Sequence, residues 1–551
     1  MSETTRRELF PGVWLRTVHT DKFKSSYLSI TLLAPLDRDT AAANALIPYV
    51  LRRGTAAHPD MESLSAALDE LYGGAIEPLV RKKGETQCVG FVASFLDDAY
   101  ALEGEKILES AAALLGEMLL SPYTQDGCFC SEYTDQEKNN LTDRIRSQIN
   151  DKRTYATYRL TQLMCGEEAF GVDKLGDEES VAAVTPDSLW RRYQELLKGA
   201  AIEVYYCGSA QPERAEGALR TALAALPISG ERLDPDCEVR ITAGPQPQVV
   251  EEAMDVSQGK LALGFRTGGV TCWDEDYPAL TMFNAIFGGT TLSKLFMNVR
   301  EKLSLCYYAS SMLEKMKGLV LVSSGIEFDK YQTAKDEILS QLEAIRGGEI
   351  QDWELEGARR TLIGGHLATL DDQGRQEEFW LGQAAAGLDT TIPELTAQFE
   401  EVTREQVSAV ARKLELEMMA EELRLLYVAM TRAKEKLILT LALTEGARAL
   451  ERLGEDLSVP ISPLALERQQ NVGQWVMIHH LTRPEAGGVR ELAGLPDIRA
   501  EGLGPAWNIR WIDGAPLAED RKTEGRYTDL PELVQKDISE LAAQLRWTYP
   551  Q

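Results

Sequence analysis

The chain has 551 residues, more than one hydrophobic core usually organises, so its length predicts three or four domains. Hydrophobic residues make up 44%, charged residues 26% and aromatic residues 7% of the sequence, a composition that excludes a disordered or fibrous protein. The formal net charge of -28 repels phosphate backbones, so the whole molecule is not expected to bind nucleic acid. Local basic patches stay compatible with that charge.

None of the eight cysteines forms a CxxC pair, and most lie in apolar or strand-like runs such as AIEVYYCG. This usage predicts reduced, buried thiols in a cytosolic protein. The first residues, MSETTRRELFPG, contain no apolar signal segment, and no run of about 18 apolar residues occurs along the chain. We therefore expect a cytoplasmic protein that is neither secreted nor associated with a membrane.

The first part of the chain alternates strand-like and helix-like patterns. Strand-like runs at residues 27–36 and 201–209 bracket long amphipathic stretches. At residues 60–74, apolar side chains recur at helical spacing until two glycines end the pattern, which predicts a helix with a glycine stop. Residues 1–228 are thus expected to form an α+β domain, and residues 229–247, rich in glycine, proline and charge, are typical of a linker.

The same order of elements recurs after the linker, in residues 248–416. We expect a strand, a helix, a second strand and a series of helices, at residues 260–268, 277–289, 318–327 and 331–414. The repeat predicts two α+β domains that can clamp a chamber between them. From 417 to 551 the pattern changes to an acidic and then apolar helix, a strand and a tail with proline, glycine and tryptophan, so we expect a third, unrelated unit.

The run ALIPYVLRRGT at residues 45–55, with the order of elements around it, resembles the insulinase-like (pitrilysin) metallopeptidase family over about residues 5–415. The resemblance implies two homologous α+β sandwich domains of the LuxS/metallopeptidase type. Active members carry an HxxEH zinc motif on a helix. By this resemblance Ala45 and Tyr49 replace the two histidines and Pro48 replaces the glutamate, while Asp143 or Arg144 holds the place of the distal ligand.

Catalytic zinc needs three protein ligands and an open position for water. The replaced motif therefore predicts that this chain binds no cofactor and is not an enzyme by itself. Its other histidines in this region, His19, His58 and His366, are far apart and share no i,i+4 spacing, so we interpret them as ordinary surface or core residues. A zinc endopeptidase with unrecognised ligands remains an alternative, to be decided by bound zinc and chelator-sensitive cleavage.

The second domain keeps a different family feature. The run GGTTLSKLFMNVREKLSLCYY resembles the family's glycine-rich loop, matched by Gly288 and Gly289, and its peptide-holding pair, matched by Arg300 and Tyr307. Arginine offers a fixed fork of donors for peptide carbonyls, and tyrosine offers a rigid ring with one hydroxyl. The competing interpretation is that Arg300 pairs with a neighbouring carboxylate while Tyr307 fills the core.

In heterodimeric members of the family, one subunit brings the zinc motif and the other brings the glycine loop with the Arg/Tyr pair. This chain resembles the second kind of subunit. The implied partners are a zinc-bearing paralogue, which would hold the only zinc of the complex, and a substrate peptide. The runs at residues 22–36 and 46–55 are similar to a non-catalytic bacterial branch associated with the 5-aminopentanol modification of elongation factor P.

Residues 420–440, AEELRLLYVAMTRAKEKLILT, resemble the sixth motif of superfamily 1 (UvrD-like) helicases, with flanks similar to those of the bacterial ATP-dependent helicase/nucleases. The resemblance implies that Arg432 is an arginine finger for bound ATP. An ATP- and DNA-binding helicase function is therefore an alternative for this segment, although the chain contains no GxxxxGK[ST] phosphate loop. His479 and His480 are adjacent in sequence, and we expect both to be surface residues.

Overall fold

The computed structural model describes residues 3–227, 236–241, 258–327, 330–414, 446–455, 472–492 and 494–495. The chain divides into two compact units, Met1–Ala433 and Lys434–Gln551. The predicted linker lies largely outside the described residues, and so does the predicted change of pattern near residue 416. Within the described part of the chain, no helix is both long and apolar enough to cross a bilayer.

The first half of the larger unit is built on a six-stranded sheet. Its spatial order places the last strand of this half, β8, between β2 and β3, so the sheet closes only after some 200 residues of chain. The β2–β8 pair is parallel, and the other neighbours are antiparallel. In order across the sheet, the strands are β1 (Glu3–Phe10), β2 (Val13–His19), β8 (Ala201–Gly208), β3 (Ser25–Pro35), β5 (Thr86–Leu96) and β4 (Ala75–Lys83).

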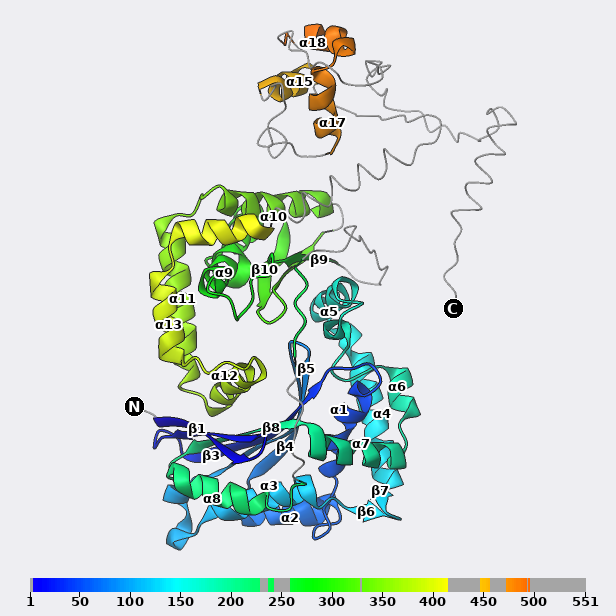
Figure 1. Ribbon diagram of the computed structural model, residues 1–551, viewed down its shortest axis with the longest axis vertical. Coiled ribbons are helices and arrows are strands. Elements are labelled where there is room, and N and C mark those ends of the chain that lie inside the picture. Colours follow the sequence, from blue (N-terminus) through cyan, green and yellow to red (C-terminus); the bar gives the residue numbers. More distant parts are fainter. Residues whose placement is uncertain are drawn as a thin grey trace, which may run out of the picture. The chain divides into compact units, whose positions relative to one another are not determined.

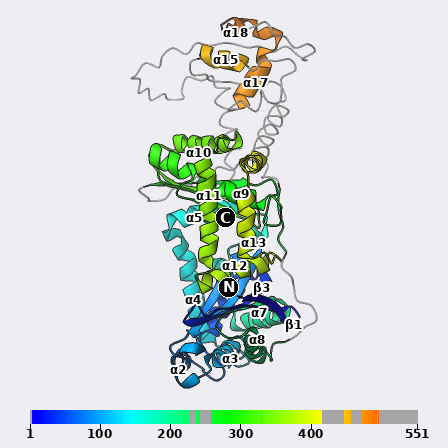
Figure 2. The same cartoon turned by 90° about the vertical axis from the view of Figure 1, so that its left-hand side faces the viewer.

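Helices cover one face of this sheet, as the amphipathic patterns predict (Figure 1; Figure 2). The core between them includes the fully buried Leu28, Ile30, Leu46 and Leu115. The short strands β6 (Thr124–Gln125) and β7 (Cys128–Phe129) form a separate hairpin. The helices of this half are α1 (Ala41–Leu51), α2 (Met61–Glu70), α3 (Ile107–Leu120), α4 (Ser131–Ser147), α5 (Lys152–Met164), α6 (Glu178–Ala183), α7 (Pro186–Gly199) and α8 (Pro212–Ala222).

The helix predicted at residues 60–74 is confirmed as α2. Asp60 and Ser63 form a reciprocal capping box at its start, which satisfies two backbone donors that the helix itself cannot use. Gly73 follows with φ of +69°, a left-handed conformation that glycine adopts without strain, and the Gly74 amide donates to the Leu68 carbonyl at 3.1 Å. The glycine stop expected from the sequence is thus present.

The second half repeats the mixed architecture. Its described sheet is antiparallel, with the order β10 (Cys306–Glu314), β11 (Leu319–Ile326) and β9 (Gly259–Arg266). Helix α9 (Tyr277–Asn284) continues into two π-helical segments, η5 (Ala285–Gly289) and η6 (Leu295–Lys302). The remaining helices are α10 (Tyr331–Arg346), α11 (Asp352–Thr369), α12 (Gln373–Ala385) and α13 (Ile392–Glu401). The fold class is α+β, with two domains of one architecture, as expected.

Each half lends one helix to the sheet of the other. Helix α12 lies on the face of the first sheet that α3 and α8 leave open (Figure 1). There Leu381 packs with Leu33 and Leu79, and Trp380 packs with Tyr205. Apolar side chains on both faces explain why β3 and β8 read as nearly continuous hydrophobic runs.

Helix α5 of the first half makes the reciprocal contact on the second sheet. Its Leu160 and Met164 pack against Leu319 and Leu321 of β11, next to Phe170. Gly264 of β9 lies directly below this helix, because a Cβ added there would come within 2.9 Å of the Met164 methyl carbon. The two halves therefore share their cores.

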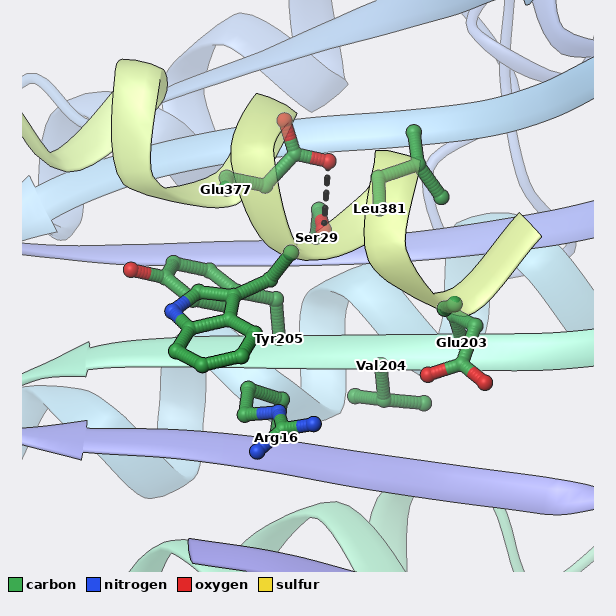
Figure 3. Close-up of a pocket in the computed structure, with 9 residues that line it drawn as sticks. Arg16, Ser29, Glu203, Val204, Tyr205, Glu377 and Leu381 are labelled. Carbon is green, nitrogen blue, oxygen red and sulfur yellow. Dashed lines mark hydrogen bonds between the residues drawn. The ribbon is translucent and has the colours of Figure 1, made fainter. Parts of the chain in front are cut away.

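Polar groups also join α12 to the first sheet (Figure 3). Glu377 accepts hydrogen bonds from Ser29 at 3.2 Å and from Arg81 at 2.5 Å, and Arg16 stacks over the Trp380 ring at 4.1 Å. A cavity of about 10 Å³ remains between them, large enough for about one water molecule. Burial raises the pKa of Glu377, so the Arg81 pair is needed to keep this carboxylate charged.

A second polar contact between the halves is completely buried. Lys317, in the turn between β10 and β11, has no exposed side-chain surface. Its Nζ lies 2.6 Å from a Glu85 carboxylate oxygen and 2.8 Å from a Glu168 oxygen, and Arg266 pairs with the same Glu168. Both glutamates belong to the first half and both cations to the second. We name these four side chains the ionic core.

We predict that Lys317→Met destabilises the protein strongly. The substitution removes the cation but leaves Glu85 and Glu168 buried, and breaking a buried ion pair from one side costs about 3–5 kcal/mol of unfolding free energy. Denaturant titration followed by circular dichroism measures the effect. Lys330→Met is the matched control, because Lys330 pairs with Glu327 on the surface, where an ion pair contributes less than about 1 kcal/mol. Equal losses in the two variants would contradict the prediction.

Candidate functional site

Helix α1 carries the three positions of the replaced zinc motif. Ala45 and Pro48 are buried on this helix, whereas Tyr49 is half-buried. A methyl group and a proline ring offer no metal-binding atom, and burial raises the pKa of the Tyr49 phenol, which keeps it neutral near pH 7. None of the three groups is a zinc ligand in this state.

Helix α4 supplies the position expected for the distal ligand, and the structure shows what replaces the metal. The Arg144 guanidinium lies 4.1 Å from the centroid of the Tyr49 ring, a cation–π arrangement. Nearby, Arg53 of the loop after α1 pairs with Glu137 of α4 at 2.5 Å. Two arginines thus join the helices that a zinc ion would otherwise bridge, and their charge opposes binding of a cation. The residues present do not fit zinc.

The three histidines of this part of the chain lie in separate environments. His58 Nδ1 is 3.0 Å from a Glu117 oxygen, His19 Nδ1 is 3.2 Å from the Ala210 carbonyl oxygen, and His366 stacks on Phe399. Burial lowers the pKa of His366. Among the described residues, no three His, Cys, Asp or Glu side chains are grouped as a metal would require.

The Arg300 and Tyr307 pair lies where η6 leads into β10. Tyr307 is 72% exposed, so the interpretation that it fills the core is wrong. The register of β10 against β11 shifts between Cys306 and Tyr308, and this irregularity projects the intervening Tyr307 away from the sheet. Arg300 lies over the Phe296 ring at 4.6 Å, with its Nε 3.5 Å from a Glu301 oxygen. Its peptide-binding role stays a prediction.

The glycines of the predicted loop have a packing role. Gly288 is buried in η5, and a Cβ added there would lie 2.5 Å from the Ser311 amide nitrogen of β10. Gly289 is exposed, and its Cβ would lie 2.9 Å from atoms of Asn284. Only glycine permits η5 to approach β10 so closely. A structural requirement therefore exists at Gly288 whether or not the loop contacts a peptide.

Sequence reasoning missed a cationic group beside this pair. Arg153 of α5 lies over the ring of Tyr308, 4.2 Å from its centroid, and Lys260 of β9 approaches the same ring at 5.7 Å. Arg153 is separated from the other two residues by more than 100 positions along the chain. Only the adjacent tyrosines in the run CYY were visible as a signal.

The described part of the smaller unit consists of α15 (Gly446–Glu455), α17 (Val472–Leu481) and α18 (Gly487–Leu492), packed through a small apolar cluster. The expectation of a surface position is wrong for His480, which is 3% exposed because it shares α17 with the buried Ile478 and Leu481. Burial lowers the pKa of His480 to about 4. The predicted arginine finger, Arg432, lies outside the described residues.

We predict that Gly288→Ala lowers stability by about 1–3 kcal/mol, because the new methyl group overlaps the β10 backbone. Gly364→Ala is the control. Gly364 lies inside α11 with no atom within 4 Å of the added Cβ, so alanine should raise stability by about 0.4–1 kcal/mol there. Denaturant titration of both variants checks the opposite signs. A neutral effect of Gly288→Ala would remove the packing explanation.

The end of the larger unit and the residues after it are similar to part of a helicase. The description UvrD-like helicase C-terminal domain matches residues 389–444, which include α13. A protein of the ATP-dependent helicase/nuclease of Moorella thermoacetica is 34% identical over 119 residues, which cover 21% of this chain and 8% of that protein. The resemblance predicted for residues 420–440 is confirmed, but the chain spans only a small fraction of that relative.

The larger part of the chain is similar to inactive peptidases. The description Peptidase M16 inactive domain matches residues 183–362. A conserved protein of Enterococcus faecalis V583 has a similar structure, with a TM-score of 0.67 and 28% identity over 74% of this chain and 96% of its own. The Probable inactive metalloprotease YmfF of Bacillus subtilis (strain 168) is 35% identical over 410 residues, 74% of this chain and 94% of that protein. The chain therefore belongs to the M16 peptidase family, as one of its inactive homologues.

Proposed function

We propose that this chain is the non-catalytic, peptide-binding subunit of a heterodimer whose other subunit is a zinc-bearing paralogue. The observation that carries the proposal is a contrast between the two halves. In the first half, Arg144 and Tyr49 occupy the place of the metal, whereas in the second half Tyr307 is 72% exposed beside Arg300. A chain with this distribution can hold a peptide but needs a partner for hydrolysis.

The chemistry of the two exposed groups supports the assignment. The Arg300 guanidinium presents several donors in one plane, which suits the carbonyl oxygens of an extended peptide. The Tyr307 ring can pack on the peptide while its hydroxyl donates or accepts a hydrogen bond. The zinc-bound water and the general base would come from the paralogue. The complex would form in the cytoplasm, in line with the eight free cysteines.

Two other functions remain candidates with separate tests. The match of residues 389–444 to a helicase C-terminal domain favours ATP and DNA binding by this segment, for which nucleotide binding and DNA-stimulated hydrolysis are the assays. A zinc endopeptidase with unrecognised ligands would bind zinc and cleave peptides in a chelator-sensitive way. The arginines beside Tyr49 argue against that second candidate.

We predict that peptide cleavage appears only after the chain is mixed with an HxxEH-bearing paralogue from the same genome. The isolated chain should contain no stoichiometric zinc. Arg300→Ala should reduce kcat/KM of the mixture at least about tenfold, because a hydrogen bond to a charged donor contributes about 1.5–3 kcal/mol. Zinc analysis, size exclusion and a peptide cleavage assay measure these three results.

Arg146→Ala is the matched control for Arg300→Ala, because Arg146 is an exposed arginine of α4 that pairs with Glu178 at the surface. It should leave the activity of the mixture unchanged. Free monomers after co-expression would count against the heterodimer. Zinc binding and cleavage by the isolated chain would overturn the assignment of Ala45, Pro48 and Tyr49 as lost ligand positions.

A further inference from the structure

Tyr308 is the centre of a small cationic surface built by both halves of the chain. Arg153 of α5 and Lys260 of β9 both lie over its ring, and Arg153 Nη2 also donates to the Ser310 hydroxyl at 3.0 Å. We name Arg153, Lys260, Tyr308 and Ser310 the cationic shelf. Arg153 is exposed, and the other three side chains are partly exposed, so solvent reaches the group.

The backbone determines where the Tyr308 ring lies. Tyr308 pairs with Gly325 of β11, which pairs in turn with Lys260 of β9, so the three residues form one row across the sheet. A Cβ added to Gly325 would lie 2.5 Å from the Tyr308 ring. The ring therefore rests on the glycine and points along the row toward Lys260. Arg153 approaches from α5, which packs on this face of the sheet.

The charges of the shelf are not neutralised. The chain has 86 acidic and 58 basic residues, and its other cations commonly find a carboxylate, as Arg81 does with Glu377. Within the described ranges, neither Arg153 nor Lys260 lies within 4 Å of one. Asp151, the nearby acid, already accepts hydrogen bonds from the Arg153 and Thr154 amides at the start of α5.

Two cations beside an aromatic ring form an arrangement that suits an anion with an apolar neighbour. A carboxylate can accept two parallel hydrogen bonds from the planar guanidinium of Arg153 and a third from the ammonium of Lys260. The ring of Tyr308 can pack against the methylene groups that carry that carboxylate. A protein with a net charge of -28 otherwise repels such a ligand, so the shelf is a local exception.

We propose that the cationic shelf binds an acidic side chain of the peptide that this chain holds. The proposal rests on the peptide-binding function proposed above and specifies the class of peptide. Tyr307, the exposed residue of the predicted peptide-holding pair, directly precedes Tyr308 at the same end of β10. A peptide bound at Tyr307 would therefore present its neighbouring side chains to the shelf, where glutamate or aspartate is favoured over glutamine or asparagine.

The test uses the full chain and two fluorescein-labelled peptides, Gly-Ser-Glu-Leu-Glu-Leu-Ser-Gly and the same sequence with glutamine in place of glutamate. Fluorescence anisotropy should give a Kd about tenfold lower for the glutamate peptide, a difference that shrinks between about 50 mM and 200 mM salt. The double variant Arg153→Gln with Lys260→Gln should bind the two peptides equally. Arg191→Gln, which changes an exposed arginine of α7 paired with Asp187, should retain the preference.

Several results would overturn the proposal. Equal binding of the two peptides by the unchanged chain, or no binding of either, excludes recognition of a carboxylate. A preference that survives in the double variant places the recognition elsewhere. Displacement of the peptide by inorganic phosphate at a similar concentration would reveal a general anion site. Thermal melting by circular dichroism confirms that each variant is folded.

The outcome can be separated from that of the proposed function. Arg300→Ala should weaken both peptides by a similar factor and leave the preference for glutamate, because Arg300 is assigned to the peptide backbone. The binding assay contains no paralogue, so the preference can be present even if no heterodimer forms. Loss of the glutamate preference in Arg300→Ala would show that Arg300, rather than the shelf, reads the acidic side chain.

Discussion

The burial of Lys317 between Glu85 and Glu168 is the interaction on which the arrangement of the two halves depends. An ammonium group without exposed surface must keep its carboxylate partners, since an unpaired buried charge is costly. Because the carboxylates come from the first half and the cation from the second, the halves cannot separate at this point without breaking the pair. Arg266, which pairs with the same Glu168, adds a second link.

The exchange of helices follows from this contact. With the halves held together, α12 covers the open face of the first sheet and α5 covers that of the second, so neither sheet exposes its apolar side chains. The same placement of α5 brings Arg153 to Tyr308. The cationic shelf is thus a consequence of the way in which the halves pack, although its residues come from three distant parts of the chain.

The loss of the zinc motif has also changed the packing around it. Helices α1 and α4 are joined by the stack of Arg144 on Tyr49 and by the pair of Arg53 with Glu137, and the arginines of both contacts oppose a cation. A single substitution at Ala45 would not recreate a metal site. In the second half, the tight approach of Gly288 to β10 keeps the local backbone that places Tyr307 at the surface. The inactive half and the exposed pair are therefore built independently.

Local patterns determined much of this protein by themselves. The capped helix α2 with its stop at Gly73, the paired domains and the replaced motif at Ala45, Pro48 and Tyr49 follow from short runs of sequence, because helix ends and strand alternation depend on neighbouring residues. Periodicity could not show that His480 is buried or that Arg144 stacks on Tyr49. Only the tertiary structure decided those contacts and the meeting of Arg153, Lys260 and Tyr308, because each depends on how whole elements pack across distances that local pattern does not encode.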